Sequence, residues 1–192
     1  MAIRKSDRRS TARRVEYLLI ECVSPELDGG RYPIKRIVGD SVVVGADILK
    51  EGHDQVAARV VFTGPGDEDW CSAPMAYDVE GDRWYGTFPV DRIGQWTFSV
   101  EAWTDRFATW RSALKKKVDV GQDVANDLLD GGLFARAAAR SARSKAARAS
   151  LLMTAKVLED RRDIAIEQAI QRALDDDFLA LMRENLRPTD LT

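Results

Sequence analysis

The single histidine, His53, is the residue whose type most readily supports acid–base chemistry in this sequence. It precedes Asp54, and a histidine–carboxylate pair can act as a general base. The alternative is structural, because the Gly52-His53-Asp54 run lies between two strand-like segments, where glycine and aspartate commonly form turns. A lone histidine without a nearby group of cysteines or carboxylates identifies no metal site. The sequence therefore predicts no metal, no cofactor and no catalytic residue.

Aromatic side chains offer a second kind of chemistry, because their rings can stack on the apolar C–H faces of sugars. The aromatic residues in or just after strand-like segments are Tyr77, Trp84, Tyr85, Trp96, Trp103 and Trp110. Trp96 alternates with other apolar residues and is expected to face the core, whereas Trp84 lies beside a turn and is the tryptophan most expected to be exposed. Packing in a core or interface is the alternative. The candidate sugar-binding or interface surface comprises His53, Trp84, Tyr85, Arg31 and Tyr32.

The charged residues do not form a recognisable catalytic group. A glycosidase needs two opposed carboxylates about 5 to 9 Å apart, and the acidic runs at 67–69 and 175–177 fit a loop and the start of a helix. A basic stretch contains Arg136, Arg140, Arg143, Lys145 and Arg148, separated mainly by alanine. It could bind phosphate or an acidic partner, but the same spacing suits a solvated helix face.

The composition is that of a protein with a buried core. Hydrophobic residues make up 45% of the 192 residues, enough for one large domain or two small ones, and the net charge of −2 gives no general reason to expect nucleic acid as a partner. No segment approaches the roughly 18 consecutive apolar residues of a membrane span. The basic residues at 1–14 are not followed by the apolar segment of a secretion signal, so we expect a cytoplasmic protein. Cys22 and Cys71 are then expected to be reduced thiols, with a disulfide between them as the alternative.

Residues 15–118 are expected to form an antiparallel β-sandwich of the immunoglobulin type. Valine, isoleucine and aromatic residues alternate there with polar residues, and clusters of glycine, proline and aspartate interrupt them. The expected strands are 16–23, 34–38, 41–50, 55–63, 75–79, 84–90 and 95–102. Short strands with turns about every ten residues are typical of such a sandwich. Because the cysteine–tryptophan–cysteine pattern of antibodies is absent, only the architecture is predicted.

The composition changes near residue 105 from strand-forming to helix-forming residues, and no glycine follows Gly132. We expect a small antiparallel bundle of four helices at 119–187, followed by a tail at 188–192. Asp123 is expected to cap a helix, and Gly131-Gly132 to break one. Residues 1–14 are expected to be a disordered basic arm, because a charged segment with few apolar groups cannot offset its ordering entropy. The alternative is that this arm contacts an anionic polymer. The predicted fold class is α+β.

Three blocks of sequence, at 23–36, 52–54 and 100–111, carry a resemblance to a known family. In their order and spacing they resemble the N-terminal region of the bacterial maltosyltransferases, which transfer maltose from α-maltose 1-phosphate to α-1,4-glucans. The likeness extends from about Val15 to about Asn185. It implies a β-sandwich with an inserted helical bundle, both taking part in a homodimer, ahead of a retaining (β/α)₈ barrel of the α-amylase superfamily.

A barrel of that kind needs about 250 residues, and none of its motifs occurs in this sequence. No catalytic residue of the family can therefore be assigned here, and the sequence is expected to be either a fragment or a truncated stand-alone copy. The resemblance implies a non-catalytic N-terminal module that serves dimerisation and active-site support in glycogen or α-glucan metabolism. Its expected partners are a second copy and the downstream barrel, with α-glucan contact as a further candidate and no nucleic acid or membrane. The alternative is a free-standing carbohydrate-binding or protein-interaction module.

Overall fold

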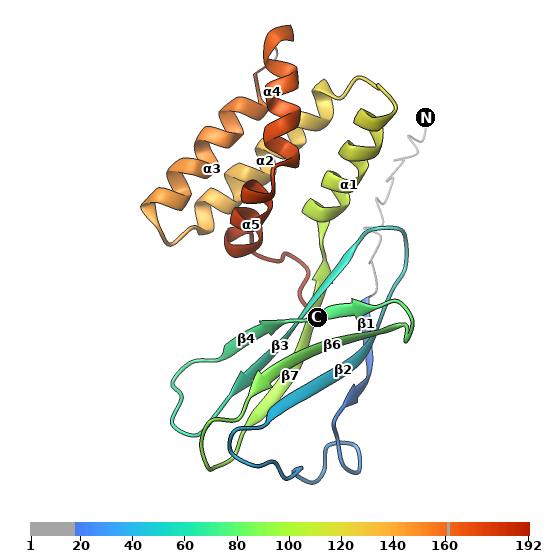
Figure 1. Cartoon of the computed structure of the whole chain (residues 1–192), viewed down its shortest axis with the longest axis vertical. Helices are drawn as coiled ribbons and strands as arrows, with labels where there is room; N and C mark the ends of the chain where they lie inside the picture. Colours follow the sequence, from blue (N-terminus) through green and yellow to red (C-terminus); the bar gives the residue numbers. More distant parts are fainter. Residues whose placement is uncertain (1–17, 161) are drawn as a thin grey trace, which may run out of the picture.

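The computed structural model describes residues 18–160 and 162–192, with the side chains of 163 and 164 left out. The expected basic arm at 1–14 and the start of the first expected strand lie outside these residues. The described chain has an α+β fold, with two antiparallel sheets at one end and helices at the other (Figure 1). No helix in this part of the chain is long and apolar enough to cross a membrane.

Seven strands form one four-stranded and one three-stranded sheet in the described residues. The four-stranded sheet has the order β1-β2-β6-β5, with β1 at Leu18–Ser24, β2 at Ser41–Lys50, β6 at Arg83–Pro89 and β5 at Ala76–Asp78. The three-stranded sheet has the order β4-β3-β7, with β4 at Cys71–Pro74, β3 at Val56–Thr63 and β7 at Thr97–Thr104. All paired strands are antiparallel. The immunoglobulin-type assignment stays a prediction.

The two sheets pack face to face around one hydrophobic core. Alternate residues of β2 point into it, as a period of two requires, and they are Val42, Val44 and Ala46. Phe62 of β3 stacks on Phe88 of β6, with ring centroids 4.7 Å apart and ring planes 14° apart. Because these rings belong to different sheets, their contact ties the two layers together.

One expected strand is wrong, and one observed strand was not expected. Residues 34–38 form an irregular segment in which Ile37 is largely exposed, because the charged Lys35 and Arg36 occupy its centre and leave no apolar face to bury. The observed strand β4 has the sequence Cys-Ser-Ala-Pro. It contains none of the β-branched or aromatic residues that mark strands in a sequence.

The helical part of the described chain has five helices, and four of them lie within 119–187, where four were expected. They are α1 at Arg106–Asp119, α2 at Ala125–Ser141, α3 at Lys145–Leu158, α4 at Asp163–Leu174 and α5 at Asp176–Asn185. α1 follows β7 after one residue, Asp105, whose carboxylate accepts the backbone N–H of Ala108 at 2.8 Å. The carboxylate of Asp123 likewise accepts the N–H of Ala125, the first residue of α2, at 2.9 Å. These aspartates satisfy N–H groups that the helices themselves leave free.

The helices share a second hydrophobic core. Phe107, Trp110 and Leu114 of α1 are buried in it. The side chains of α1 thus pack with the helices, although most of α1 falls within the range 15–118 that the sequence assigns to the sandwich. The packing changes near Asp105, where the composition also changes.

The expected break at Gly131-Gly132 is wrong, because α2 continues through both glycines. A Cβ atom on Gly131 would lie 2.3 Å from Cζ2 of Trp110. The indole N–H of Trp110 also donates to the carbonyl oxygen of Asp127 at 2.8 Å. Glycine at position 131 therefore allows α1 to approach the backbone of α2 closely.

The segment after α5 returns to the sandwich. The backbones of Ala102 and Thr192 exchange two hydrogen bonds, at 3.1 and 3.0 Å, so the last described residue pairs with β7. Figure 1 shows this end of the chain beside the junction between the sheets and the helices.

Candidate functional site

The structure separates the sequence-predicted surface residues. The segment 25–40 leads into the start of β2, and the turn at 51–55 follows its end, so the two lie at opposite ends of the sandwich (Figure 1). Arg31 and Tyr32 lie in the first segment, and His53 lies in the second, next to the start of α1. They cannot form one site.

His53 does not form the hypothesised pair with its neighbour. The carboxylate of Asp54 pairs instead with the ammonium group of Lys50 at 3.3 Å. His53 is exposed, and within the described chain it makes no hydrogen bond or ion pair. A general base needs a positioned partner or substrate contact, so this turn offers no preorganised acid–base site.

Trp84 and Tyr85 are consecutive residues of β6 and point to opposite sides of the sheet. Trp84 lies opposite Ala46, packs against the sandwich core and contacts the ring of Tyr77 at a centroid distance of 5.5 Å. It is half-buried, which corrects the expectation that it is the most exposed tryptophan. Tyr85 lies on the outer face, where a Cβ atom on Gly45 would be 3.1 Å from its Cε1 atom.

A polar cluster lies beside Tyr85 on the outer face of the four-stranded sheet. Arg83 pairs with Asp47 at 3.3 Å and donates to the hydroxyl of Ser24 at 3.0 Å and to the carbonyl of Cys22. Asp47 raises the pKa of the Cys22 thiol, first by accepting its hydrogen bond and then by its charge. Because the thiolate is the reactive form, a raised pKa is expected to lower the reactivity of Cys22 at neutral pH.

The second thiol, Cys71, lies on the other sheet. Both cysteines are free and exposed in the structure, so the alternative of a disulfide between them is not observed.

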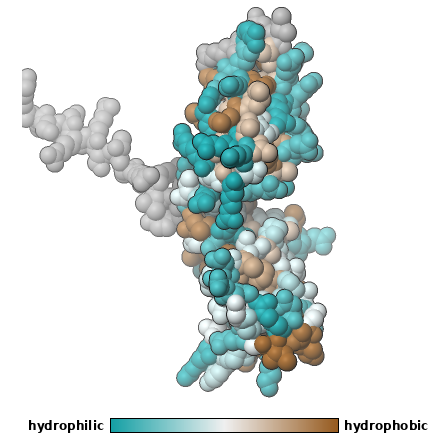
Figure 2. All heavy atoms as spheres, turned by 90° about the vertical axis from the view of Figure 1, so that its left-hand side faces the viewer, coloured by the Kyte–Doolittle hydropathy of each residue, from teal (hydrophilic) through white to brown (hydrophobic). Residues whose placement is uncertain are grey.

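Arg31 and Tyr32 line a cavity of about 630 Å³ at the end of the sandwich farthest from the helices. Its other wall is the loop between β6 and β7, where Arg92 lies 5.0 Å from the ring centroid of Trp96 and pairs with Asp91 at 2.9 Å. Hydrophobic residues gather at this end of the molecule (Figure 2). The most exposed of those that line the cavity is Ile93, at 91%.

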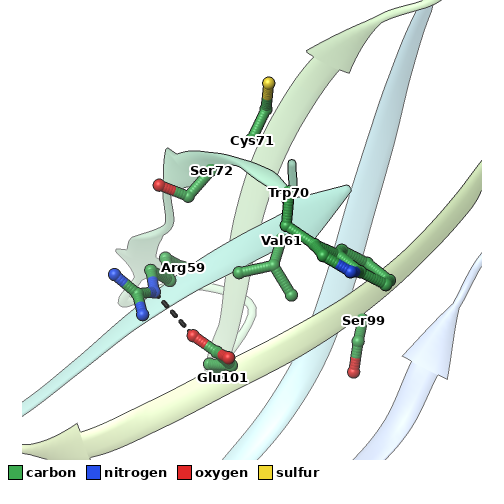
Figure 3. Close-up of a pocket in the computed structure, with 7 residues that line it drawn as sticks. All are labelled: Arg59, Val61, Trp70, Cys71, Ser72, Ser99 and Glu101. Carbon is green, nitrogen blue, oxygen red and sulfur yellow. Dashed lines mark hydrogen bonds and ion pairs between the residues drawn. The ribbon is translucent and has the colours of Figure 1, made fainter. Parts of the chain in front are cut away.

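A shallow groove of about 480 Å³ crosses the outer face of the three-stranded sheet (Figure 3). Arg59 of β3 and Glu101 of β7 form an ion pair on its floor, with Nε and Oε2 2.6 Å apart. The guanidinium of Arg59 also lies 5.6 Å from the ring centroid of Trp103. The groove is completed by the indole of Trp70 and by the side chains of Val61, Cys71, Ser72 and Ser99.

Trp70 is the most exposed tryptophan in the described chain, at 55%. Sequence analysis missed it because its importance depends on β4, which follows it and carries no strand signal. The one available signal was a tryptophan directly after the acidic loop 67–69, a polar context that favours exposure.

The described residues form no metal site, because they contain no group of three histidine, cysteine, aspartate or glutamate side chains that could hold an ion. The two hollows described above carry aromatic and polar groups, and neither is built like a metal or acid–base centre.

Comparison with known proteins identifies the family. Residues 16–192 match the model of the family described as alpha-1,4-glucan:maltose-1-phosphate maltosyltransferase, domain N/S. The chain belongs to this family. Among the curated maltosyltransferases of that name, the protein of Myxococcus xanthus is 44% identical over 135 residues and that of Chlorobaculum tepidum is 36% identical over 168 residues. Maltosyltransferase 2 of Streptomyces coelicolor is 39% identical over 139 residues.

These alignments cover 68%, 88% and 72% of the present chain. They cover only 20%, 24% and 21% of the relatives in the same order. The chain thus corresponds to the N-terminal region of a maltosyltransferase and spans less than a quarter of the length of these relatives.

Within this N/S region, the sandwich carries both hollows. The helical core is filled by its own side chains, including Phe178, Leu151 and Met182, which are fully buried.

Proposed function

We propose that this chain is a non-catalytic N-terminal module of a maltosyltransferase, which transfers maltosyl units from α-maltose 1-phosphate to α-1,4-glucans in glycogen or α-glucan metabolism in the cytoplasm. The observation that carries the proposal is the match of residues 16–192 to the N/S domain of that family. The role of such a module is dimerisation and support of the active site.

Dimerisation is supported by apolar side chains that the single chain leaves uncovered. On the outer face of the four-stranded sheet, Leu19 lies directly opposite Leu49, and both are about half exposed, as is Val43. In the bundle, Leu133 of α2 and Met153 of α3 are 64% and 63% exposed. A two-fold dimer can cover such a patch with the same patch of a second copy.

The apolar residues that sequence analysis could not divide between core and interface are packed within the single chain. Phe134, Leu151, Leu152, Phe178 and Leu181 all belong to or contact the helical core. The proposed dimer therefore uses the sheet face and the outer sides of α2 and α3.

We propose that the end of the sandwich farthest from the helices supports the active site. The cavity there combines Arg31, Tyr32 and Arg92 with the exposed Ile93. An exposed apolar side chain ringed by arginines is a surface typical of a protein contact. The downstream catalytic barrel of the parent enzyme is the proposed occupant.

The non-catalytic part of the proposal is tested by incubating the purified chain with α-maltose 1-phosphate and a short maltooligosaccharide and measuring phosphate. No release above the protein-free control is expected. Release that follows the chain through purification and is abolished by heating would overturn this part of the proposal.

The second candidate function is a free-standing carbohydrate-binding or protein-interaction module. The observation that favours carbohydrate binding is the exposed indole of Trp70 above a polar groove. Retention of the isolated chain on immobilised glucan together with a monomeric mass at all concentrations would favour this candidate over the dimerising module.

A further inference from the structure

The groove on the outer face of the three-stranded sheet contains polar groups without partners. The hydroxyls of Ser72 and Ser99 and the indole N–H of Trp70 make no hydrogen bond within the described part of the chain. All three line the same hollow (Figure 3). They can therefore donate to a ligand, and the hydroxyls can also accept, without breaking a contact of the protein.

The aromatic surface of the groove is accessible. Trp70 is 55% exposed, and its ring lies beside Val61 and Ser99 in Figure 3. An indole held against a sheet with much of its surface free can cover the apolar face of a ring-shaped ligand.

The charges of the groove cancel. Among the described residues, Arg59 and Glu101 are the only aspartate, glutamate, lysine, arginine or histidine side chains that line it, and they are paired at 2.6 Å. Trp103 also lies against Arg59, which fixes the guanidinium over the sheet. The remaining donors of the guanidinium and lone pairs of the carboxylate can serve neighbouring hydroxyls of a neutral ligand. Because Arg59 is already paired with Glu101, the described lining of the groove offers a phosphate group no unpaired cation, so it does not suit α-maltose 1-phosphate.

A flat aromatic ring, free hydroxyls and a neutral ion pair together match a neutral pyranose, which has apolar C–H faces and a rim of hydroxyl groups. The groove is shallow and lies on an open sheet face, so it can hold part of a longer chain of sugars without enclosing its ends. We propose that this groove binds a segment of an α-1,4-glucan non-covalently, with Trp70 as the stacking platform. The choice of the α-1,4 linkage rests on the proposed function.

The position of the groove allows this contact to coexist with dimerisation. The groove lies on the outer face of the three-stranded sheet, whereas Leu19 and Leu49 lie on the four-stranded sheet. The outer faces of the two sheets point in opposite directions, because their inner faces share one core. Glucan binding at Trp70 therefore holds the polymer near the enzyme without occupying the proposed dimer surface.

The test is the migration of the full chain in native gels that contain increasing amounts of amylopectin, with maltoheptaose as a soluble competitor. The wild-type chain is expected to be retarded and to be released by maltoheptaose. Trp70→Ala is expected to weaken amylopectin binding about tenfold or more, because it removes the stacking ring. Trp70→Phe keeps a smaller ring and is expected to bind with intermediate affinity. The matched control is Tyr32→Ala, which removes an aromatic side chain of similar exposure, 52%, from the other cavity and is expected to migrate like the wild type.

Several results would overturn the proposal. One is that amylopectin does not retard the wild-type chain, and another is that it retards the wild type and the Trp70→Ala variant equally. A third is that the wild-type chain binds a β-1,4-linked glucan as well as it binds amylopectin. Loss of binding in Tyr32→Ala alone would place the sugar site in the other cavity. Far-UV circular dichroism checks the fold of each variant. If Trp70→Ala is misfolded, the two single variants Ser99→Ala and Trp70→Phe replace it in the test. Wild-type affinity for amylopectin in both of them would contradict the proposal. None of these results depends on the phosphate-release assay, so this inference and the proposed function can fail separately.

Discussion

Trp110 of α1 lies directly on Gly131 of α2, in a position where a Cβ atom would be 2.3 Å from the indole ring. The same indole donates a 2.8 Å hydrogen bond to the carbonyl oxygen of Asp127, one turn earlier in α2. The contact joins α1, which continues from the sandwich, to the helices that follow it. Gly131 thus lets α2 pack closely against α1, the helix that follows directly from the sandwich.

Gly131→Ala is therefore expected to lower the free energy of unfolding by about 1–3 kcal/mol, the range for overpacking a buried site. Alanine favours a helix over glycine by about 1 kcal/mol, but the rigid indole cannot move away cheaply. The matched control is Gly132→Ala, where the nearest atom is Cγ of Glu159, at 2.8 Å, in a side chain that can shift only by loosening its partly solvated ion pair with Arg136. We expect that variant to stay within about 1 kcal/mol of the wild type. Urea unfolding measures both, and equal effects at the two positions would contradict the packing argument.

Arg136 of α2 and Glu159, just after α3, form a two-pronged ion pair, with the Nε–Oε1 distance at 2.7 Å and the Nη2–Oε2 distance at 2.5 Å. The hydrogen bonds from Arg136 lower the pKa of Glu159. A carboxylate with a lowered pKa in the folded state stabilises the fold above its unfolded pKa of about 4.3, and this contribution is lost as the pH falls through the folded value.

Arg136→Met is expected to destabilise the chain by about 0.5–1 kcal/mol near neutral pH, since the pair is partly solvated. The difference from the wild type is expected to shrink as the pH falls below about 4. Urea unfolding across this pH range measures it. Arg143→Met is the control, because Arg143 is exposed and makes no ion pair in the described chain. A wild-type advantage that is independent of pH would show that Arg136 acts through packing alone.

Asp47 is expected to suppress the reactivity of Cys22, because it raises the pKa of the thiol. In a Cys71→Ser background only Cys22 remains to react. Asp47→Asn is then expected to increase the rate of alkylation by iodoacetamide at a pH slightly below the thiol pKa, where the rate follows the thiolate fraction. At a pH well above the pKa the two rates should converge. A variant that reacts no faster at any pH would exclude control by Asp47.

The alternation of apolar residues predicted the sandwich strands well where one face is buried. The strand β2 occupies the expected residues because Val42, Val44 and Ala46 recur at every second position and are buried on one face, while Ser41 and Val43 between them are exposed. The change of composition near residue 105 likewise located the start of α1, since Asp105 is a residue type that caps helices.

What the sequence did not reveal depends on contacts between distant residues. Trp84 faces inward because its strand partner is Ala46, a core residue, and a nearby turn does not change that register. Gly131 continues a helix because Trp110 covers it, which no local pattern encodes. Trp70 becomes part of a groove only through pairing of β3 with β4 and β7.

The central claim, that this chain is an assembly module, is tested most directly by sedimentation equilibrium over a wide range of concentrations. The account predicts a mass that rises from the monomer toward the dimer for the wild-type chain. A Leu19→Glu, Leu49→Glu double variant, which places like charges opposite each other on the proposed interface, should remain monomeric. Ile93→Glu, which changes an exposed residue at the other end of the sandwich, should behave like the wild type. A folded wild-type chain that stays strictly monomeric at the highest concentration would contradict the claim.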